Sequence, residues 1–449
     1  MRTSTKWRLI IPAVAIAAIV SGCGTGSNNN NKQQTNPAGQ APNGIDYNEA
    51  VELSIYASSS SFTEELFKTR IEEHVRKKFP NYKITYVKPG SMTVPDMIAT
   101  NHVPDIFLFA LPEMQKNLFP NGLQYDLTEL IKKYKVDLNR FDPGLLQTFR
   151  EVSGEGKLYG LPESTNPHVM FYNKDLYDKF GVPYPKNGMT WDEAYEMSRK
   201  LTNFQEGIPY KGIALFFRTV LVNNEDSLPL IDAKTERAAV NTALWKKQFD
   251  NLKRFYELNG MLTGYKSGSD GGTELTSFYT DKNMAAIVSP FSGYTRDGMK
   301  DINWDMVSVP VHPENKGVGL QVEPRGIFIA NTSKVKEQAF HVLMHVLSDE
   351  VELANSKAGK TTSLNNETIT KSFASEIDLL KGKNTSAVFY NKVAPSPQVP
   401  ALSTNAGNLL SKEFDAVIQG KKDVNTALRN AEESINKAVE EEIAKTRKP

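Results

Sequence analysis

The stretch VELSIYA at Val51–Ala57 decides the fold, because it begins a regular alternation of strands and helices. Apolar side chains occupy every second position, which is the period of a β-strand. Further strands are expected at residues 83–87 and at 106–109 (IFLF), with a helix before each of them. Strands that alternate with helices form an α/β unit with a largely parallel sheet.

The helix that follows the first strand is expected to begin with a capping box of Ser61 and Glu64. In such a box the hydroxyl and the carboxylate each accept from a free backbone N–H. Pro80 ends this helix. The apolar residues that recur every four positions predict its core-facing side, and they are Phe67, Ile71, Val75 and Phe79.

The same alternation continues along the chain. Thr190 and Glu193 form a second expected capping box, which opens a helix that extends to about Thr202. The other expected elements are a short helix at residues 96–100, helices at 238–259 (with Leu244 among its apolar positions) and 334–347, a C-terminal helix capped by Asp423, and strands at 284–288, 307–309 and 326–330.

The N-terminus has the composition of an export signal. Three basic residues lie within residues 1–8, and residues 9–20 are uncharged and apolar. This pattern is typical of a secretory signal and is too short for a transmembrane helix. The tetrad VSGC at residues 20–23 resembles the lipobox of bacterial lipoproteins, which implies cleavage before Cys23 and diacylglycerol on its sulfur. The alternative is an ordinary signal with a chance cysteine.

Charge and cysteine content narrow the function classes. The 449 residues include 53 Lys and Arg and 52 Asp and Glu, so neither nucleic acid nor an anionic membrane surface is indicated as a partner. Cys23 is the only cysteine, which leaves no intramolecular disulfide and no thiolate metal site. The polar residues 24–48 predict a flexible tether. The length favours two or three domains.

Loops after the first strands are the expected ligand site, because ligands of α/β sheets lie beyond the carboxyl ends of strands. The first loop, residues 58–61, offers four serine hydroxyls that could bind a polyol or simply cap the helix. The segment 162–168 is rich in proline and polar residues, as interdomain crossings are. A third loop, residues 110–113, follows the strand IFLF. The candidate ligand-binding residues of the three loops are Ser58, Ser60, Ser61, Glu113 and Glu163.

Short motifs follow one another in a fixed order along residues 103–340. They are VPDIF at 103–107, YGLP at 159–162, FYNKDL at 171–176, FGVP at 180–183, TWDE at 190–193, FYTDKNMA at 278–285, IANTSK at 329–334 and AF at 339–340. In this order they resemble extracellular solute-binding protein family 1, the carbohydrate type of ABC-importer substrate-binding lipoprotein.

This resemblance implies a two-lobed periplasmic-binding-protein-like fold. Each lobe is a mainly parallel α/β sheet flanked by helices, and a hinge of two or three crossings joins the lobes, which close on a ligand. The expected division is a signal peptide at 1–22, a tether at 23–48, a first lobe at 49–164 plus 318–358, and a second lobe at 165–317 plus 359–449.

The resemblance also implies ligand contacts at three positions. Phe109 and Phe291 match sugar-stacking aromatic positions of the maltodextrin-binding member, and Asn166 matches a carboxylate there that contacts hydroxyls. Phenyl rings in place of indoles keep the apolar face but lose the N–H donor. These departures put maltodextrin in doubt and leave a smaller or less stacked saccharide open. The alternative for both rings is core packing.

Two further groups are candidates from their chemistry alone. Tyr294 ends the turn FSGY and adds a phenol near Phe291. Glu323 and Arg325 flank Pro324 before an expected strand, where they could form bidentate hydrogen bonds to vicinal hydroxyls or a solvated surface pair.

His341 and His345 have the spacing of a zinc pair, but the general-base glutamate is missing, so we interpret them as structural and expect no metal.

The sequence therefore predicts a monomeric solute-binding lipoprotein that delivers a carbohydrate, in the first instance an oligosaccharide, to the permease of an ABC importer. It is expected on the outer face of the cytoplasmic membrane of a Gram-positive bacterium, anchored through Cys23, with no cofactor and no enzymatic activity. The alternatives are a binding protein for a peptide, polyamine or other polar solute, a receptor that signals without transport, and a secreted carbohydrate-active enzyme that uses Glu163 and Glu323.

Overall fold

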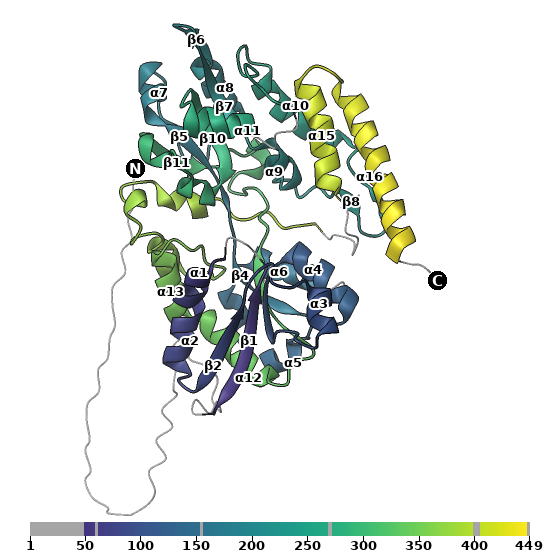
Figure 1. Cartoon of the computed structure of the whole chain (residues 1–449). Helices are drawn as coiled ribbons and strands as arrows, with labels where there is room; N and C mark the ends of the chain where they lie inside the picture. The colour runs from purple at the N-terminus through teal and green to yellow at the C-terminus, as the bar shows by residue number, and fades with distance from the viewer. Residues whose placement is uncertain (1–48, 59–61, 153–155, 268–271, 398–404, 447–449) are drawn as a thin grey trace, which may run out of the picture. The chain divides into compact units, whose positions relative to one another are not determined.

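Two five-stranded sheets, each flanked by helices, organise the chain into two lobes (Figure 1). The computed structural model describes residues 49–446 apart from 59–61, 153–155, 268–271 and 398–404. All of the described residues belong to one structural unit, Gly39–Pro449. The predicted α/β class is confirmed, and both sheets are mixed rather than purely parallel.

The first sheet begins with the predicted strands. The strand β1 pairs in parallel with β2 and β3, whereas β12 enters from a distant part of the sequence and runs antiparallel to β3 and β4. Its order is β2 (Tyr82–Val87), β1 (Val51–Ala57), β3 (Ile106–Ala110), β12 (Arg325–Ile329) and β4 (Gly160–Ser164).

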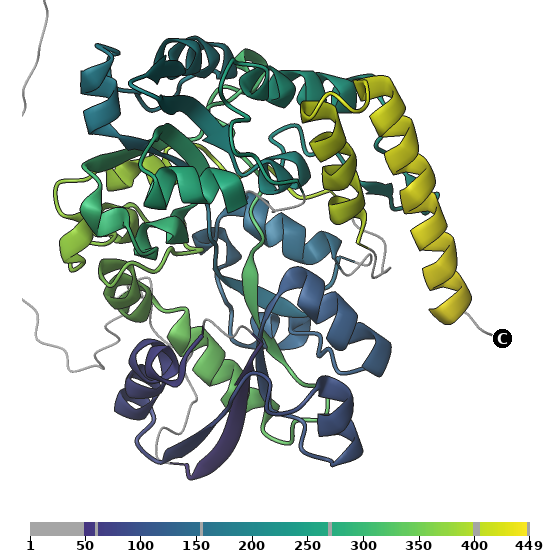
Figure 2. The same ribbon diagram turned by 45° about the horizontal axis from the view of Figure 1, so that its top comes forward.

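Helices flank this sheet on both sides, with α1, α2, α12 and α13 on one side and α3 to α6 on the other (Figures 1 and 2). A π-helical turn, Lys68–Glu72, joins α1 to α2. The helices are α1 (Glu64–Phe67), α2 (Glu73–Lys78), α3 (Val94–Ala99), α4 (Leu111–Asn117), α5 (Thr128–Lys133), α6 (Pro143–Glu151), α12 (Lys336–Val346) and α13 (Asp349–Lys357).

The first helix differs from the prediction at its cap but not at its packing face. The N-cap is Thr63, whose hydroxyl accepts from Leu66 N at 3.2 Å, whereas Ser61 lies outside the described residues. Threonine serves as well as serine here because both place a hydroxyl oxygen opposite the free N–H. The predicted stripe is confirmed: Phe67, Ile71, Val75 and Phe79 are all at most 2% exposed.

The second sheet is built around β5, which runs antiparallel to both of its neighbours. The strand β10 pairs in parallel with β7, and the short β6 forms the edge. Its order is β11 (Trp304–Ser308), β5 (His168–Asn173), β10 (Met284–Pro290), β7 (Ile208–Leu215) and β6 (Asn203–Gln205). A separate two-stranded ribbon pairs β8 (Ile231–Asp232) with β9 (Arg237–Ala238).

The helices of the second lobe include the two whose N-terminal caps were predicted. Thr190 and Glu193 form the expected capping box, and Asp423 accepts from Thr426 N at 3.0 Å at the start of the C-terminal helix. The helices are α7 (Lys174–Lys179), α8 (Trp191–Leu201), α9 (Phe217–Val222), α10 (Ala243–Tyr256), α11 (Gly272–Leu275), α15 (Ala406–Ile418) and α16 (Val424–Thr446). The short helix α14 (Glu367–Lys371) instead packs on α13 of the first lobe.

The helix expected from residue 238 begins five residues later. Residue 238 is used by β9, and Thr242 caps α10 by accepting from Trp245 N at 3.3 Å. Of the apolar positions of this helix, Leu244 is 52% exposed, whereas Leu252 and Phe255 are fully buried. Among the described residues, no helix is long and apolar enough to cross a membrane.

The lobes are connected by chain that crosses between the sheets at three places. The first crossing joins β4 to β5, and the second joins β11 to β12. The third follows α13, and there Leu364 and Ile369 still pack in the core of the first lobe. That core therefore extends beyond residue 358, where the sequence analysis divides the lobes, because the chain returns to β4 before it leaves. The other expected boundaries stay predictions.

Candidate functional site

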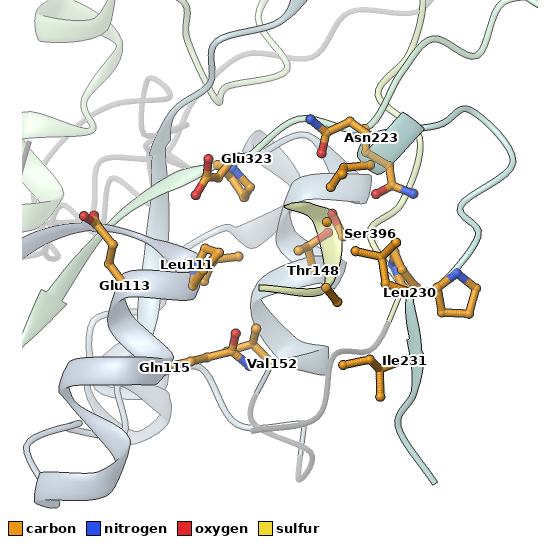
Figure 3. Close-up of a pocket in the computed structure, with 18 of the residues that line it drawn as sticks. Leu111, Glu113, Gln115, Thr148, Val152, Asn223, Leu230, Ile231, Glu323 and Ser396 are labelled. Carbon is orange, nitrogen blue, oxygen red and sulfur yellow. The ribbon is translucent and has the colours of Figure 1, made fainter. Parts of the chain in front are cut away.

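A cavity of about 880 Å³ lies where the carboxyl end of β3 meets the second lobe. Leu111 and Glu113 line it from α4, which begins where β3 ends (Figure 3). Leu230 and Ile231 face it from the other lobe, and Glu323 faces it from the second crossing. The location agrees with the rule that ligands of α/β sheets bind beyond the carboxyl ends of the strands.

Glu113 is positioned by the ends of two strands of the first sheet. The Ser58 hydroxyl, just after β1, donates to its Oε2, and Ala110 N, at the end of β3, donates to the same oxygen at 3.2 Å. This carboxylate is therefore held in place at the rim of the cavity. Ser58 acts through Glu113, and the other candidates in its loop, Ser60 and Ser61, lie outside the described residues.

Glu323 is the second carboxylate of the cavity. Solvent reaches its side chain, but the cleft around it removes part of its hydration, and this desolvation together with the charge of Glu113 raises the pKa of Glu323. Arg325 and Arg218 act in the opposite direction. The two carboxylates are thus near enough to repel each other, and two guanidinium groups partly compensate for this repulsion.

Arg218 is a residue of the cavity that the sequence analysis missed. It lies in α9, immediately after β7, and its Nε donates to Asn408 Oδ1 at 2.7 Å. This contact ties α9 to the first turn of α15. Its position directly after a strand could have identified it as a site residue. The strand itself was not recognised, because Ile208–Leu215 contains Pro209, Lys211 and Gly212 and lacks the alternation of apolar and polar residues.

The two expected stacking rings lie in hydrophobic cores, which corrects the prediction that they present a face to the ligand. Phe109 is 1% exposed and stacks on Phe107 with ring centroids 5.1 Å apart. Phe291 is 3% exposed and packs on Tyr294 and Phe373 at 4.8 and 5.2 Å. Neither lines the cavity. The alternative interpretation, core packing, describes both rings.

Three more candidates lie apart from the cavity lining. Asn166 Nδ2 donates to Ser292 Oγ at 3.1 Å, and Ser292 N donates to Asn166 Oδ1 at 3.2 Å, so this exposed amide joins the first crossing to the turn after β10. Tyr294 is half-buried, and burial raises its pKa. Arg325 is half-buried at the start of β12, near Glu323.

Glu163 is held in a buried ion cluster. Lys360 Nζ lies 2.8 Å from Glu163 Oε1 and 2.7 Å from Glu352 Oε1, and all three side chains are at most 6% exposed. Burial opposes each charge, but the two carboxylates outweigh it and raise the pKa of Lys360, which in turn lowers the pKa of Glu163. Glu163 is therefore not free to pair with Glu323 in acid–base chemistry.

The third crossing is bound to β4 beside this cluster. The Thr361 hydroxyl donates to Thr165 O, and Ser363 Oγ donates to Pro162 O at 2.6 Å. Pro162 is the middle residue of β4, and Thr165 directly follows the strand, where the first crossing begins. Lys360 thus stands at the point where two crossings meet.

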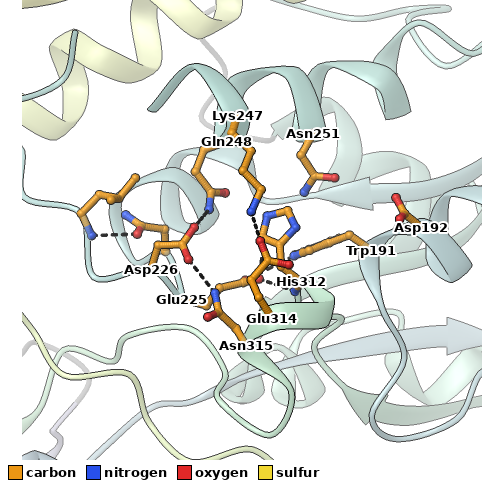
Figure 4. Close-up of polar contacts among 12 residues, drawn as sticks. Trp191, Asp192, Glu225, Asp226, Lys247, Gln248, Asn251, His312, Glu314 and Asn315 are labelled. Atoms are coloured by element: carbon orange, nitrogen blue, oxygen red, sulfur yellow. Dashed lines mark hydrogen bonds and ion pairs between the residues drawn. The ribbon is translucent and has the colours of Figure 1, made fainter. Parts of the chain in front are cut away.

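A polar cluster in the second lobe surrounds Glu225 and Asp226, which follow the cavity residue Asn223 in sequence (Figure 4). Glu225 is 5% exposed and accepts from His312 N at 2.5 Å and from Trp191 Nε1 at 3.2 Å. Burial raises the pKa of Glu225 to about 7. Lys247, Asp226 and Glu314 supply the other charges of this cluster.

The two histidines that have the spacing of a zinc pair make other contacts. His345 Nε2 contacts His74 O at 3.1 Å, and the ring of His341 packs edge-on against Tyr134. No group of three potential ligands (His, Cys, Asp or Glu) is close enough to hold a metal ion in the part of the chain that the structure describes.

Comparison with known proteins identifies the class to which the fold and the cleft belong. Residues 56–352 match the family described as bacterial extracellular solute-binding protein, and the chain belongs to this family. Its fold is also that of a solved sugar transporter protein of Rhizobium etli in an open conformation, with a TM-score of 0.71 and 21% identity over 86% of this chain and 99% of that one.

Curated relatives resemble the chain at low sequence identity. The chain is 22% identical to the sn-glycerol-3-phosphate-binding periplasmic protein of Brucella abortus over 340 residues, which cover 69% of this chain and 74% of that protein. It is 25% identical to the galactooligosaccharide-binding protein of Bacillus subtilis over 294 residues, which cover 62% and 65%. The predicted family and two-lobed fold are confirmed.

We predict that Lys360→Met destabilises the protein by about 3–5 kcal/mol, because it leaves two buried carboxylates without their cation. Urea unfolding at pH 7 measures this change. Lys371→Met, which breaks an ion pair with Glu367 whose side chains are 72% and 80% exposed, is the matched control and should change the stability by less than about 1 kcal/mol. Equal effects of the two substitutions would contradict the buried cluster.

Glu225 should make stability fall as the pH rises. Its folded-state pKa of about 7 lies above its ordinary value of 4.5, so the folded state holds the proton more tightly. The resulting stability is fully present below pH 4.5 and is lost as the pH rises through 7. We expect Glu225→Gln to remove roughly 2–3 kcal/mol of the stability difference between pH 5 and pH 8.

Urea unfolding of wild type and variant at both pH values measures this effect, and the other titrating groups cancel in the comparison. Glu206→Gln, on the turn between β6 and β7, is the control and should keep the wild-type dependence. A Glu225→Gln variant with the wild-type pH dependence would show that the buried carboxyl does not titrate in this range.

Proposed function

We propose that the chain captures a neutral carbohydrate, in the first instance an oligosaccharide, between its two lobes and delivers it to the permease of an ABC importer. The observation that carries the proposal is the position of Glu113, Glu323 and Arg218 around one cavity with apolar walls. Carboxylates accept from vicinal hydroxyls and a guanidinium donates to them, while Leu111 and Leu230 offer apolar surface to sugar C–H groups.

The charge of the cavity favours a neutral ligand over a phosphorylated one. The described residues that line it include four carboxylates and two cations, the latter being Lys116 and Arg218. A phosphate beside Glu113 and Glu323 would meet like charges in a partly desolvated site, where repulsion is strong. The galactooligosaccharide-binding relative supports the same ligand class, whereas the glycerol-phosphate-binding relative supplies the natural control ligand.

Binding, closure and delivery follow from one equilibrium. A ligand that contacts Glu113 from the first lobe and Arg218 from the second gains more contacts when the lobes approach. It therefore shifts an open–closed equilibrium towards the closed state, which the permease recognises. In this proposal the chain acts as a monomer without a cofactor, and no chemical step occurs on the ligand.

The predicted lipid anchor is part of this proposal. Cys23 and the signal before it lie outside the described residues, so the support is the lipobox-like tetrad alone. Diacylglycerol on Cys23 would hold the protein on the outer face of the cytoplasmic membrane of a Gram-positive cell, with residues 24–48 as the tether. Permease genes beside this gene would distinguish an importer component from a receptor.

The ligand class is tested with purified residues 49–449 in a thermal-shift screen, followed by calorimetry. The panel contains galacto-, arabino- and maltooligosaccharides, with sn-glycerol-3-phosphate, spermidine and a tripeptide as controls. One saccharide series should raise the Tm, because a ligand that binds only the folded state stabilises it by mass action. Shifts confined to the glycerol phosphate, amine or peptide would overturn the carbohydrate assignment.

Glu323→Ala should weaken binding of the responding saccharide about 10- to 100-fold, since it removes a charged hydrogen-bond acceptor from the cavity. Glu367→Ala, on the exposed start of α14, is the control and should bind as the wild type does. Equal affinities of the two variants would remove Glu323 from the binding site.

Replacement of Cys23 tests the anchor. In a Gram-positive host, wild-type protein should sediment with membranes and incorporate labelled fatty acid, whereas Cys23→Ser should do neither and should appear in the culture medium. Equal membrane association and labelling of the two proteins would contradict lipidation at this residue.

A further inference from the structure

Two residues with amide side chains line the cavity from neighbouring segments of the chain. Asn223 follows α9, and Gln321 belongs to the second crossing. Gln321 N donates to Asn223 O at 3.1 Å, so the two backbones are held next to each other. Both residues line the cavity, and Figure 3 labels Asn223 on its upper wall.

Gln321 has a free hydrogen-bond donor. Its side chain is 5% exposed, and within the described part of the chain its Nε2 is buried without a hydrogen-bond partner. A primary amide carries two N–H donors and an acceptor oxygen, and a buried donor without a partner is costly. A residue that only filled space here would be better replaced by an apolar side chain of the same length.

The wall beneath the amides is firmly held. Asn224 Oδ1 accepts from Leu228 N at 2.9 Å, and Asp226 accepts from Gln248 Nε2 at 2.7 Å and from Asn315 Nδ2 at 2.6 Å (Figure 4). Consecutive side chains therefore anchor the turn that follows Asn223. A polar group on such a base needs little ordering when a ligand arrives, which favours affinity.

We propose that Asn223 and Gln321 form a polar subsite that receives one hydroxylated ring of the ligand, with the Gln321 amide donating to an oxygen of that ring. Leu230 and Ile231, which line the same cavity, supply the apolar surface for its C–H groups. The proposal rests on the proposed function and names neutral, oxygen-rich ring units as what this part of the cavity selects.

Gln321→Met tests the subsite, because it keeps the length of the side chain and removes the N–H donors and the carbonyl oxygen of the amide. Calorimetry with galactotriose, arabinotriose and maltotriose should show about a tenfold loss of affinity for the saccharide that the wild type binds. The Tm without ligand should stay equal or rise, since an unpaired buried donor is gone. A merely structural role would instead lower the Tm and leave the affinity of the folded protein unchanged.

Asn223→Ala provides a second variant at a half-buried position, where folding is less at risk, and it too should weaken binding. Gln124→Met is the matched control: its amide also has a buried unpartnered atom in the described structure, but it lies in the first lobe and does not line the cavity. The Gln124→Met variant should bind the saccharide with the same affinity as the wild type.

The outcomes separate the two proposals. If wild type binds one of the three saccharides and both Gln321→Met and Asn223→Ala bind it equally well, the subsite is wrong and the proposed function stands. If wild type binds none of the three and responds only to sn-glycerol-3-phosphate, the carbohydrate function fails and the sugar subsite falls with it.

Discussion

The buried ammonium of Lys360 is the interaction on which the arrangement of the chain depends. It lies between Glu163 of β4 and Glu352 of α13, and the hydroxyls of Thr361 and Ser363 donate to backbone oxygens in β4 and directly after it. The chain passes along β4 here, and it still packs in the core of the first lobe at Leu364 and Ile369. A buried cation with two carboxylate partners fixes which segments meet, since loss of any member leaves an uncompensated charge.

The cleft follows from this constraint and from the direction of the strands. Because β1 and β3 run parallel, their carboxyl ends bring Ser58, Ala110 and Glu113 to the same edge of the sheet. The second crossing returns to the first lobe at β12 and places Glu323 beside that edge. The opposing charges of Arg218 and Arg325 allow two carboxylates to share one cleft.

Local patterns in the sequence predicted the elements well, because period, caps and breakers are properties of neighbouring residues. The strand Val51–Ala57, the stripe of the first helix and the capping box at Thr190 are confirmed. The ligand contact that the family resemblance implied for Phe109 is wrong. The run IFLF has no polar alternation, which is the pattern of a strand buried on both faces, so its last ring packs in the core.

The polar site was predictable only in part, since burial and pairing depend on partners far away in sequence. Of the carboxylates predicted to contact the ligand, Glu113 and Glu323 line the cavity. Glu163 forms a buried ion pair with Lys360 and does not line it. Nothing near Glu163 in the sequence signals that partner. Arg218 was missed for the related reason that the strand before it carries Lys211, which is buried and donates to Ser277 Oγ at 3.0 Å.

The two walls of the cleft differ in what holds them, and this difference bears on selectivity. Glu113 is oriented by a hydroxyl and a backbone N–H at strand ends. On the other wall, Asn223 precedes a turn anchored by Asn224, Glu225 and Asp226, and the backbone N–H of Gln321 donates to Asn223 O. Groups that are already ordered lose little freedom on binding, so their hydrogen bonds count almost fully towards discrimination. Closure of the lobes then adds contacts to a ligand that the anchored wall has already selected, and the hinge need not distinguish one solute from another.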